Sequence, residues 1–75
     1  MPLRFNTCPH CGERIIFRIS TDDIDTSKYP APVYILHDDD SCGKTSTFFV
    51  DSLLFVSYKE LEKKPGAIKT IKTTK

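Results

Sequence analysis

The sequence predicts a small all-β domain with a three- to four-stranded antiparallel sheet and a possible short C-terminal helix. Its 75 residues allow one domain, and a domain of this size buries too little apolar surface to be stable without further support. Short runs of β-branched and aromatic residues, several of them alternating with polar residues, favour strands. A Cys-x-x-Cys turn at Cys8–Cys11 and a third cysteine, Cys42, supply groups through which a metal ion could provide that support.

The first predicted hairpin is organised around the turn Cys8-Pro9-His10-Cys11-Gly12. Pro9 favours a turn, and Gly12 permits a positive φ directly after the second thiol. Residues 1–6 form a candidate strand before the turn. Residues 13–20 form a second strand whose alternation places three apolar side chains on one face and leaves two arginines facing solvent: Ile15, Phe17 and Ile19 against Arg14 and Arg18.

A turn-rich connection is expected over residues 20–32. Within it, Thr21-Asp22-Asp23 can begin a brief helical turn, and Pro30-Ala31-Pro32 prevents a longer helix. A strand follows over residues 33–37 and ends at His37, and the acidic run Asp38–Asp40 forms the next loop.

The C-terminal third is predicted to contain a hairpin, a short helix and a tail. Residues 45–50 and 53–58 flank Asp51-Ser52, which we expect to form a tight turn. The spacing from Ser57 to Glu60 is that of a helix capping box, so a helix over residues 58–64 is expected to end at Pro65-Gly66. Residues 67–75 are then a tail, disordered unless a partner orders it. The expected division is a domain over 1–58 and a basic helix or tail over 59–75.

His37 and Cys42 are the predicted partners of Cys8 and Cys11 in one Zn²⁺ site. Cys42 precedes Gly43 just as Cys11 precedes Gly12, so the two halves are similar. Three thiolates and one imidazole would fill a tetrahedral site and leave no position for a substrate. His10 and Asp40 are alternatives to His37. Cys8 and Cys11 could instead be a reduced pair or a disulfide, and Cys42 a small buried apolar residue.

With these residues the chain resembles the zinc-ribbon family, in which two turns carried on β-hairpins hold one zinc ion. The resemblance covers roughly residues 5 to 58 and rests on Cys-Pro-His-Cys-Gly and Cys42-Gly43. The chain departs from the family at the second turn, where His37 replaces one cysteine of the usual Cys-x-x-Cys. The resemblance implies a fold and a metal, but no particular activity.

Cys-Pro-His-Cys is also similar to the active-site tetrapeptide of bacterial disulfide oxidases of the thioredoxin fold. That chemistry requires a strand before the motif and a helix after it. Residues 13–19 have the composition of a strand instead. A thiol-disulfide oxidoreductase is therefore a remote alternative, and we expect no enzyme activity.

The charges are unevenly distributed, although the net charge is only +1. Residues 1–58 contain five basic and eight acidic residues, whereas residues 59–75 contain six lysines and two glutamates. The expected role is a protein-interaction module or an accessory subunit. Its surface would be acidic or aromatic, drawn from Asp22, Asp23, Asp25, Asp38–Asp40, Phe48, Phe49, Phe55 and Tyr58; these aromatic residues could equally pack against one another.

Nucleic-acid binding is the alternative function, because the tail is rich in lysine and Arg14 and Arg18 lie on one strand. The tail lysines are Lys63, Lys64, Lys69, Lys72 and Lys75. No small-molecule substrate and no membrane association are expected. The sequence shows no leader and no long apolar run, so a cytoplasmic protein is expected.

Overall fold

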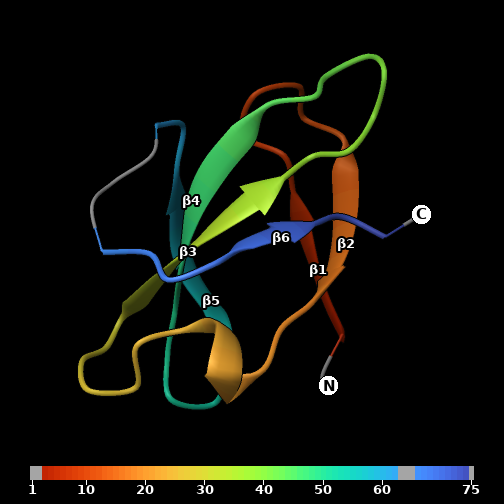
Figure 1. Cartoon of the computed structure of the whole chain (residues 1–75). Helices are drawn as coiled ribbons and strands as arrows, with labels where there is room; N and C mark the ends of the chain where they lie inside the picture. Colours follow the sequence, from red (N-terminus) through yellow and green to blue (C-terminus); the bar gives the residue numbers. More distant parts are fainter. Residues whose placement is uncertain (1–2, 63–65, 75) are drawn as a thin grey trace.

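The computed structural model describes residues 3–62 and 66–74, and it confirms the all-β class (Figure 1). Six strands lie in two sheets within these residues, together with one short 3₁₀ turn. In chain order they are β1 (Leu3–Thr7), β2 (Arg14–Arg18), the turn η1 (Thr21–Asp23), β3 (Ala31–Leu36), β4 (Thr45–Val50), β5 (Val56–Glu60) and β6 (Thr70–Lys72).

The first sheet is the antiparallel hairpin of β1 and β2, with Phe5 opposite Ile16. Ile15 and Phe17 are buried at 3% and 0% exposure, whereas Arg14 and Arg18 are exposed. The alternation predicted for this strand is therefore confirmed. The helical turn expected at Thr21–Asp23 is also present.

The second sheet has the strand order β5-β4-β3-β6. The hairpin of β3 and β4 forms its centre, with Val33 opposite Phe48. β5 pairs antiparallel with β4, but β6 pairs parallel with β3. The strands thus differ from the single antiparallel sheet that we expected, because they divide into two sheets and one pair is parallel.

The core lies between the two sheets. Phe17 of β2 contacts Phe48 of β4 edge to face, with ring centroids 5.5 Å apart, and both side chains are fully buried. Aromatic pairs of this geometry add about 1 kcal/mol to the free energy of burial. The hairpin β1–β2 therefore covers one face of the larger sheet.

The predicted helix over residues 58–64 is wrong for its first three residues, because residues 58–60 belong to β5. Tyr58 lies opposite Phe49 of β4, and their rings stack with centroids 4.4 Å apart. Pairing with a neighbouring strand therefore outweighs the local capping pattern. The rest of the predicted helix includes residues 63 and 64, which lie outside the described residues.

The expectation of a tail disordered without a partner is also wrong for residues 66–74. Thr70–Lys72 form β6, and Ile71 lies opposite Ile35 in the sheet. The amide of Thr74 donates to the carbonyl of Ile16, so the end of the chain joins the two sheets (Figure 1). The expected boundary after residue 58 falls within β5.

The turn between β4 and β5 is longer than the two-residue turn that we predicted. β5 begins only at Val56, because Asp51 organises a wider loop. Its Oδ1 accepts hydrogen bonds from the amides of Leu53 (2.9 Å) and Phe55 (3.0 Å). Leu54 adopts a positive φ of 65° and enters the core at 8% exposure.

Candidate metal centre

The two cysteine-containing turns lie at the same end of the molecule, at the top of Figure 1. The first turn connects β1 to β2 and is closed by two backbone hydrogen bonds. The amide of Cys8 donates to the carbonyl of Glu13 (2.7 Å), and the amide of Gly12 donates to the carbonyl of Cys8 (2.8 Å). Gly12 has a φ of +80°, which confirms the conformation predicted for it.

The second turn connects β3 to β4 and begins at His37, directly after β3 ends. The amide of His37 donates to the carbonyl of Lys44 (3.0 Å), and the amide of Cys42 donates to the carbonyl of Asp39 (3.0 Å). Gly43 follows with a φ of +64°. Each hairpin thus presents its donor groups from a short, hydrogen-bonded turn.

The four predicted ligands meet between these turns. One donor atom from each of Cys8, Cys11, His37 and Cys42 lies within 4.8 Å of every other. The sulfurs of Cys8 and Cys42 are 3.8 Å apart, and Sγ of Cys11 is 3.4 Å from Nδ1 of His37. All three cysteines are free thiols, so the cluster could hold a metal ion.

The burial of the cluster differs between its members. Cys8 and His37 are buried at 1% and 5% exposure, Cys42 is half-buried and Cys11 is exposed. Cys8 and Cys42 also contact the apolar core. The cluster therefore continues the core towards the surface.

The pKa values of the first two thiols are shifted in opposite directions. Burial raises the pKa of Cys8, but hydrogen bonds from the backbone of Cys11 and His10 and from neighbouring side chains outweigh it and lower the pKa to about 7. The backbone of Glu13 lowers the pKa of Cys11, but burial and the Cys8 and Cys42 thiols raise it to about 11. Three sulfurs this close cannot all be thiolates unless a cation lies among them.

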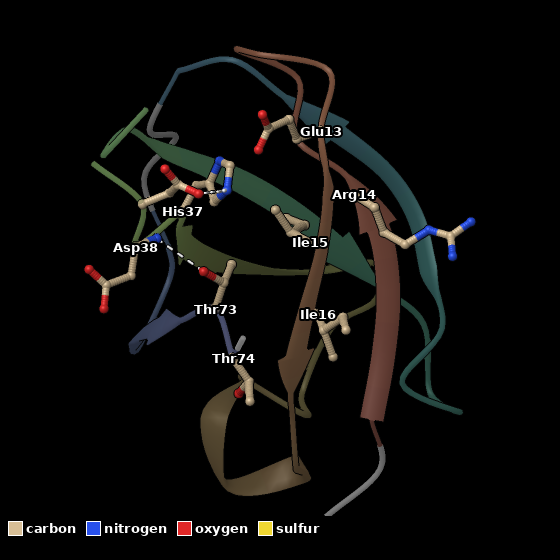
Figure 2. A pocket seen from close by; sticks show the side chains of 9 residues that line it. Glu13, Arg14, Ile15, Ile16, His37, Asp38, Thr73 and Thr74 are labelled. Carbon is tan, nitrogen blue, oxygen red and sulfur yellow. Dashed lines mark hydrogen bonds and ion pairs between the residues drawn. The ribbon is translucent and has the colours of Figure 1, made fainter. Parts of the chain in front are cut away.

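The two nitrogens of His37 face different groups. Nδ1 faces Cys11 within the cluster, whereas Nε2 lies 4.0 Å from Oδ2 of Asp39. Glu13 also lies near the imidazole, because Glu13, His37 and Asp39 offer donor atoms within 4.8 Å of one another. Figure 2 shows Glu13 and His37 at a cavity of about 160 Å³ that both residues line.

This arrangement suits a metal bound at Nδ1 of His37. A carboxylate near the other nitrogen favours a proton there, which leaves Nδ1 free to act as a ligand. From the sequence, Asp39 and Glu13 are only charged surface residues. No spacing in the sequence indicates their position, because it depends on how the two hairpins meet.

The alternatives to His37 lie outside the four-residue cluster. His10 is turned towards β4, where its Nε2 lies 3.2 Å from the carbonyl oxygen of Thr45 and donates to it. Asp40 is exposed and belongs to neither group of candidate ligands in the described chain. Thiolate and imidazole donors together suit zinc and other borderline or soft metals.

The Cys-Pro-His-Cys turn lies between two antiparallel strands, β1 and β2. The disulfide oxidases that it resembles require a helix after the motif, so that the helix N-terminus stabilises the thiolate. In this chain β2 occupies that position. The surroundings of the turn therefore differ from those that the oxidase chemistry requires.

Two of the predicted surface groups have other surroundings. Asp23 is buried at 5% exposure and pairs with Lys69 at 3.1 Å, so it does not contribute to an acidic surface. Phe48 is in the core and Phe49 stacks on Tyr58, but Tyr58 and Phe55 remain 48% and 54% exposed. The predicted aromatic surface is therefore smaller than expected.

No protein-family model matches this chain, and no curated protein or solved structure is significantly similar to it. Within residues 3–62 and 66–74, no helix is long and apolar enough to span a membrane.

Proposed function

We propose that Cys8, Cys11, His37 and Cys42 bind one Zn²⁺ ion in a zinc-ribbon domain. Around a tetrahedral zinc ion with ordinary bond lengths, two sulfurs are about 3.8 Å apart and a sulfur and a nitrogen about 3.6 Å. The corresponding distances are 3.8 Å between Cys8 and Cys42 and 3.4 Å between Cys11 and His37. This match carries the proposal.

The proposed role of the zinc is structural. Three thiolates and one imidazole complete a tetrahedral site, so no coordination position remains for a substrate. The ligands come from both hairpins, and the zinc would connect the smaller sheet to the larger one. Zinc binding would therefore contribute directly to the free energy of folding.

Metal content and thiol reactivity of the untagged protein test the zinc site together. We expect one zinc per chain by mass spectrometry of the metal, and thiols that react with a disulfide reagent only after chelation. His37→Ala should lower the zinc affinity strongly, whereas the matched variant His10→Ala should retain it. Metal-free protein with a Cys8–Cys11 disulfide would contradict the proposal.

The domain is proposed to act by binding another protein, as an interaction module or an accessory subunit. Large apolar side chains are exposed in several places, including Phe5 at 59%, Leu53 at 68% and Leu61 at 53%. Exposed apolar groups that lie close together favour contact with other proteins. The first hairpin carries such a group around Phe5.

Nucleic-acid binding through the tail receives less support. Lys69 pairs with buried Asp23, and Lys59 donates to Oδ1 of Asn6, so two of the basic residues have partners within the domain. A salt titration with single- and double-stranded oligonucleotides distinguishes the two functions. Nucleic-acid binding would weaken steeply with salt, with a logarithmic slope of about −0.9 per phosphate contact, and such a result would contradict protein binding as the main role.

A further inference from the structure

We propose that the outward face of the first hairpin binds a protein segment in which apolar residues are flanked by carboxylates. This inference rests on the proposed protein-binding function and names the surface and the chemistry of the partner. The outer hairpin face consists of the side chains that point away from the larger sheet: Leu3, Phe5 and Thr7 of β1, and Arg14, Ile16 and Arg18 of β2.

Strand pairing places these six side chains together. Side chains directly opposite in an antiparallel pair lie on the same face, and the opposite pairs here are Leu3 with Arg18, Phe5 with Ile16, and Thr7 with Arg14. The intervening residues Ile15 and Phe17 point into the core. The outer hairpin face thus has an apolar centre with an arginine near each end.

The apolar centre is accessible. Phe5 is 59% exposed and Leu3 is 37% exposed, while Ile16 is half-buried. The backbone pairing of Ile16 with Thr74 is a contact at the edge of β2, so it does not cover this face. A phenylalanine and two aliphatic side chains therefore remain available for contact with a partner.

The arginines of the first hairpin differ in their surroundings. Arg4 points to the other face, where its Nε donates to the carbonyl of Leu54 (2.7 Å) and its guanidinium lies 4.3 Å from the ring centroid of Phe55. The guanidinium groups of Arg14 and Arg18, by contrast, form no hydrogen bond or ion pair with any residue that the structure describes. Figure 2 shows Arg14 extending away from the cavity beside His37.

Since these guanidinium groups have no partner among the described residues, they indicate a binding partner that carries carboxylates. Guanidinium binds carboxylate with two parallel hydrogen bonds, a geometry that lysine cannot provide. Arg14 and Arg18 are four residues apart on one strand, a distance of about 13 Å. An extended segment lying along β2 matches this pattern when an acidic, an apolar and a second acidic residue occupy alternate positions.

The apolar residues favour a protein over a nucleic acid as the partner. Binding of single-stranded nucleic acid relies on successive bases stacking on aromatic side chains. Phe5 is the one aromatic residue of the outer hairpin face, and Leu3 and Ile16 offer no planar ring. A second copy of the chain is also disfavoured, because it would bring the arginines of both copies to one interface.

A random dodecapeptide library displayed on phage and selected against the zinc-loaded protein tests the inference. We expect the enriched peptides to contain apolar residues flanked by Asp or Glu. Arg14→Glu combined with Arg18→Glu should weaken their binding by at least about tenfold. Replacing the acidic residues of a selected peptide by lysine should restore its binding to this double variant.

Matched variants separate this face from other exposed groups. Lys44→Glu with Lys72→Glu makes the same change in charge at exposed lysines outside the outer hairpin face, and it should leave peptide binding within about twofold of the unmodified protein. Phe5→Ser should weaken binding, whereas Leu61→Ser, at a similarly exposed side chain, should not. Zinc content and amide NMR spectra verify that each variant is folded.

The outcomes distinguish this inference from the proposed function. Enriched peptides that lack acidic residues, or that are insensitive to the Arg14 and Arg18 changes, would overturn the inference while leaving protein binding intact. Oligonucleotide binding without peptide enrichment would overturn both. Dimerisation that is abolished by Phe5→Ser would also overturn the inference, because the face would then be occupied by a second copy.

Discussion

The two ends of the domain use different chemistry to hold the smaller hairpin on the larger sheet. At the metal end, the turns over residues 8–12 and 37–43 bring three thiols and one imidazole together. At the opposite end, the carboxylate of Asp23 in η1 accepts a hydrogen bond from the amide of Ser20 (2.9 Å) and pairs with Lys69 (3.1 Å). The charged groups of Asp23 and Lys69 are thus partners of each other, whereas the thiols at the first end could hold a metal ion.

This difference indicates which end of the domain would depend on a bound metal ion. The backbone of Glu13 lowers the pKa of Cys11, but burial and the neighbouring Cys8 and Cys42 thiols raise it to about 11, so proton loss from this thiol would be favoured by a bound cation. The Asp23 end is complete without any ligand. Perturbing one end and observing the other shows whether the ends are coupled through the core.

Metal removal should have the largest effect. Structural zinc supplies about 10–16 kcal/mol of apparent binding free energy in small domains at neutral pH, so chelation is expected to unfold most of the domain. Amide NMR spectra and circular dichroism with and without chelator measure this. Retention of the Asp23–Lys69 contacts in a folded apo form would show instead that the two ends are independent.

Asp23→Ala should lower the free energy of unfolding by about 1–3 kcal/mol. It removes the acceptor for the Ser20 amide and the partner of Lys69, and the Asp23 carboxylate that makes both contacts is buried. Chemical denaturation of the zinc-loaded protein measures the effect, and Asp22→Ala is the matched exposed control. Lys69→Ala should cost less, because its side chain is 62% exposed and solvent screens the pair.

Asp39→Asn should weaken zinc binding by about tenfold. The carboxylate lies 4.0 Å from Nε2 of His37 and favours the tautomer in which Nδ1 faces the cluster. Competition with a chromophoric chelator measures the affinity, and ¹⁵N NMR of the imidazole reports the tautomer. Asp40→Asn changes an exposed neighbour and should leave the zinc affinity and the tautomer of His37 unchanged. An equal loss of affinity in the two variants would show that the loss comes from the change in net charge and not from the contact with His37.

Gly12→Ala should cost about 1 kcal/mol, confined to the metal end. The φ of Gly12 is +80°, although no atom within 4 Å would touch an added Cβ, so the cost comes from backbone conformation alone. Denaturation of the zinc-loaded variant measures it. Gly12→Asn should be the milder change, since asparagine adopts positive φ more readily.

The smallest expected effect is the pH dependence of the Asp23 contribution. Burial raises the pKa of Asp23, but hydrogen bonding to Ser20 and the Lys69 charge outweigh burial and hold it below the ordinary value of 3.8. The contribution is complete above the pKa of the unfolded carboxyl and is lost as the pH falls through the lower pKa of the folded state. The difference in unfolding free energy between Asp23→Ala and the unmodified protein should therefore be constant from about pH 6 to pH 8.

The sequence predicted the features that depend on neighbours along the chain. The cysteine turn, its positive-φ glycine, the alternation in β2 and the turn at Thr21–Asp23 all follow from residues within a few positions of one another. The positions of His37 and Cys42 were predictable because each adjoins a hairpin turn. The donor set of the candidate site was therefore accessible from local patterns.

The features that the sequence did not predict depend on distant partners. Residues 58–60 match a capping box, but stacking of Tyr58 on Phe49 favours a strand. β6 is only three residues long and lies in a lysine-rich segment, so a strand there was not predicted; it forms where Ile71 pairs with Ile35 of β3. The proximity of Glu13 and Asp39 to His37 likewise arises only when the two hairpins meet.

The parallel pairing of β6 with β3 also has a consequence for the order of folding. Both hairpins join strands that are close in sequence, so each can form rapidly and independently. β6 pairs with residues far away along the chain, and Thr74 pairs with Ile16, close to the opposite end of the sequence. Because contacts of large sequence separation form slowly, both the docking of the two hairpins, which brings Cys8 and Cys42 together, and the attachment of β6 are expected to follow hairpin formation, with the Thr74–Ile16 contact among the last to form.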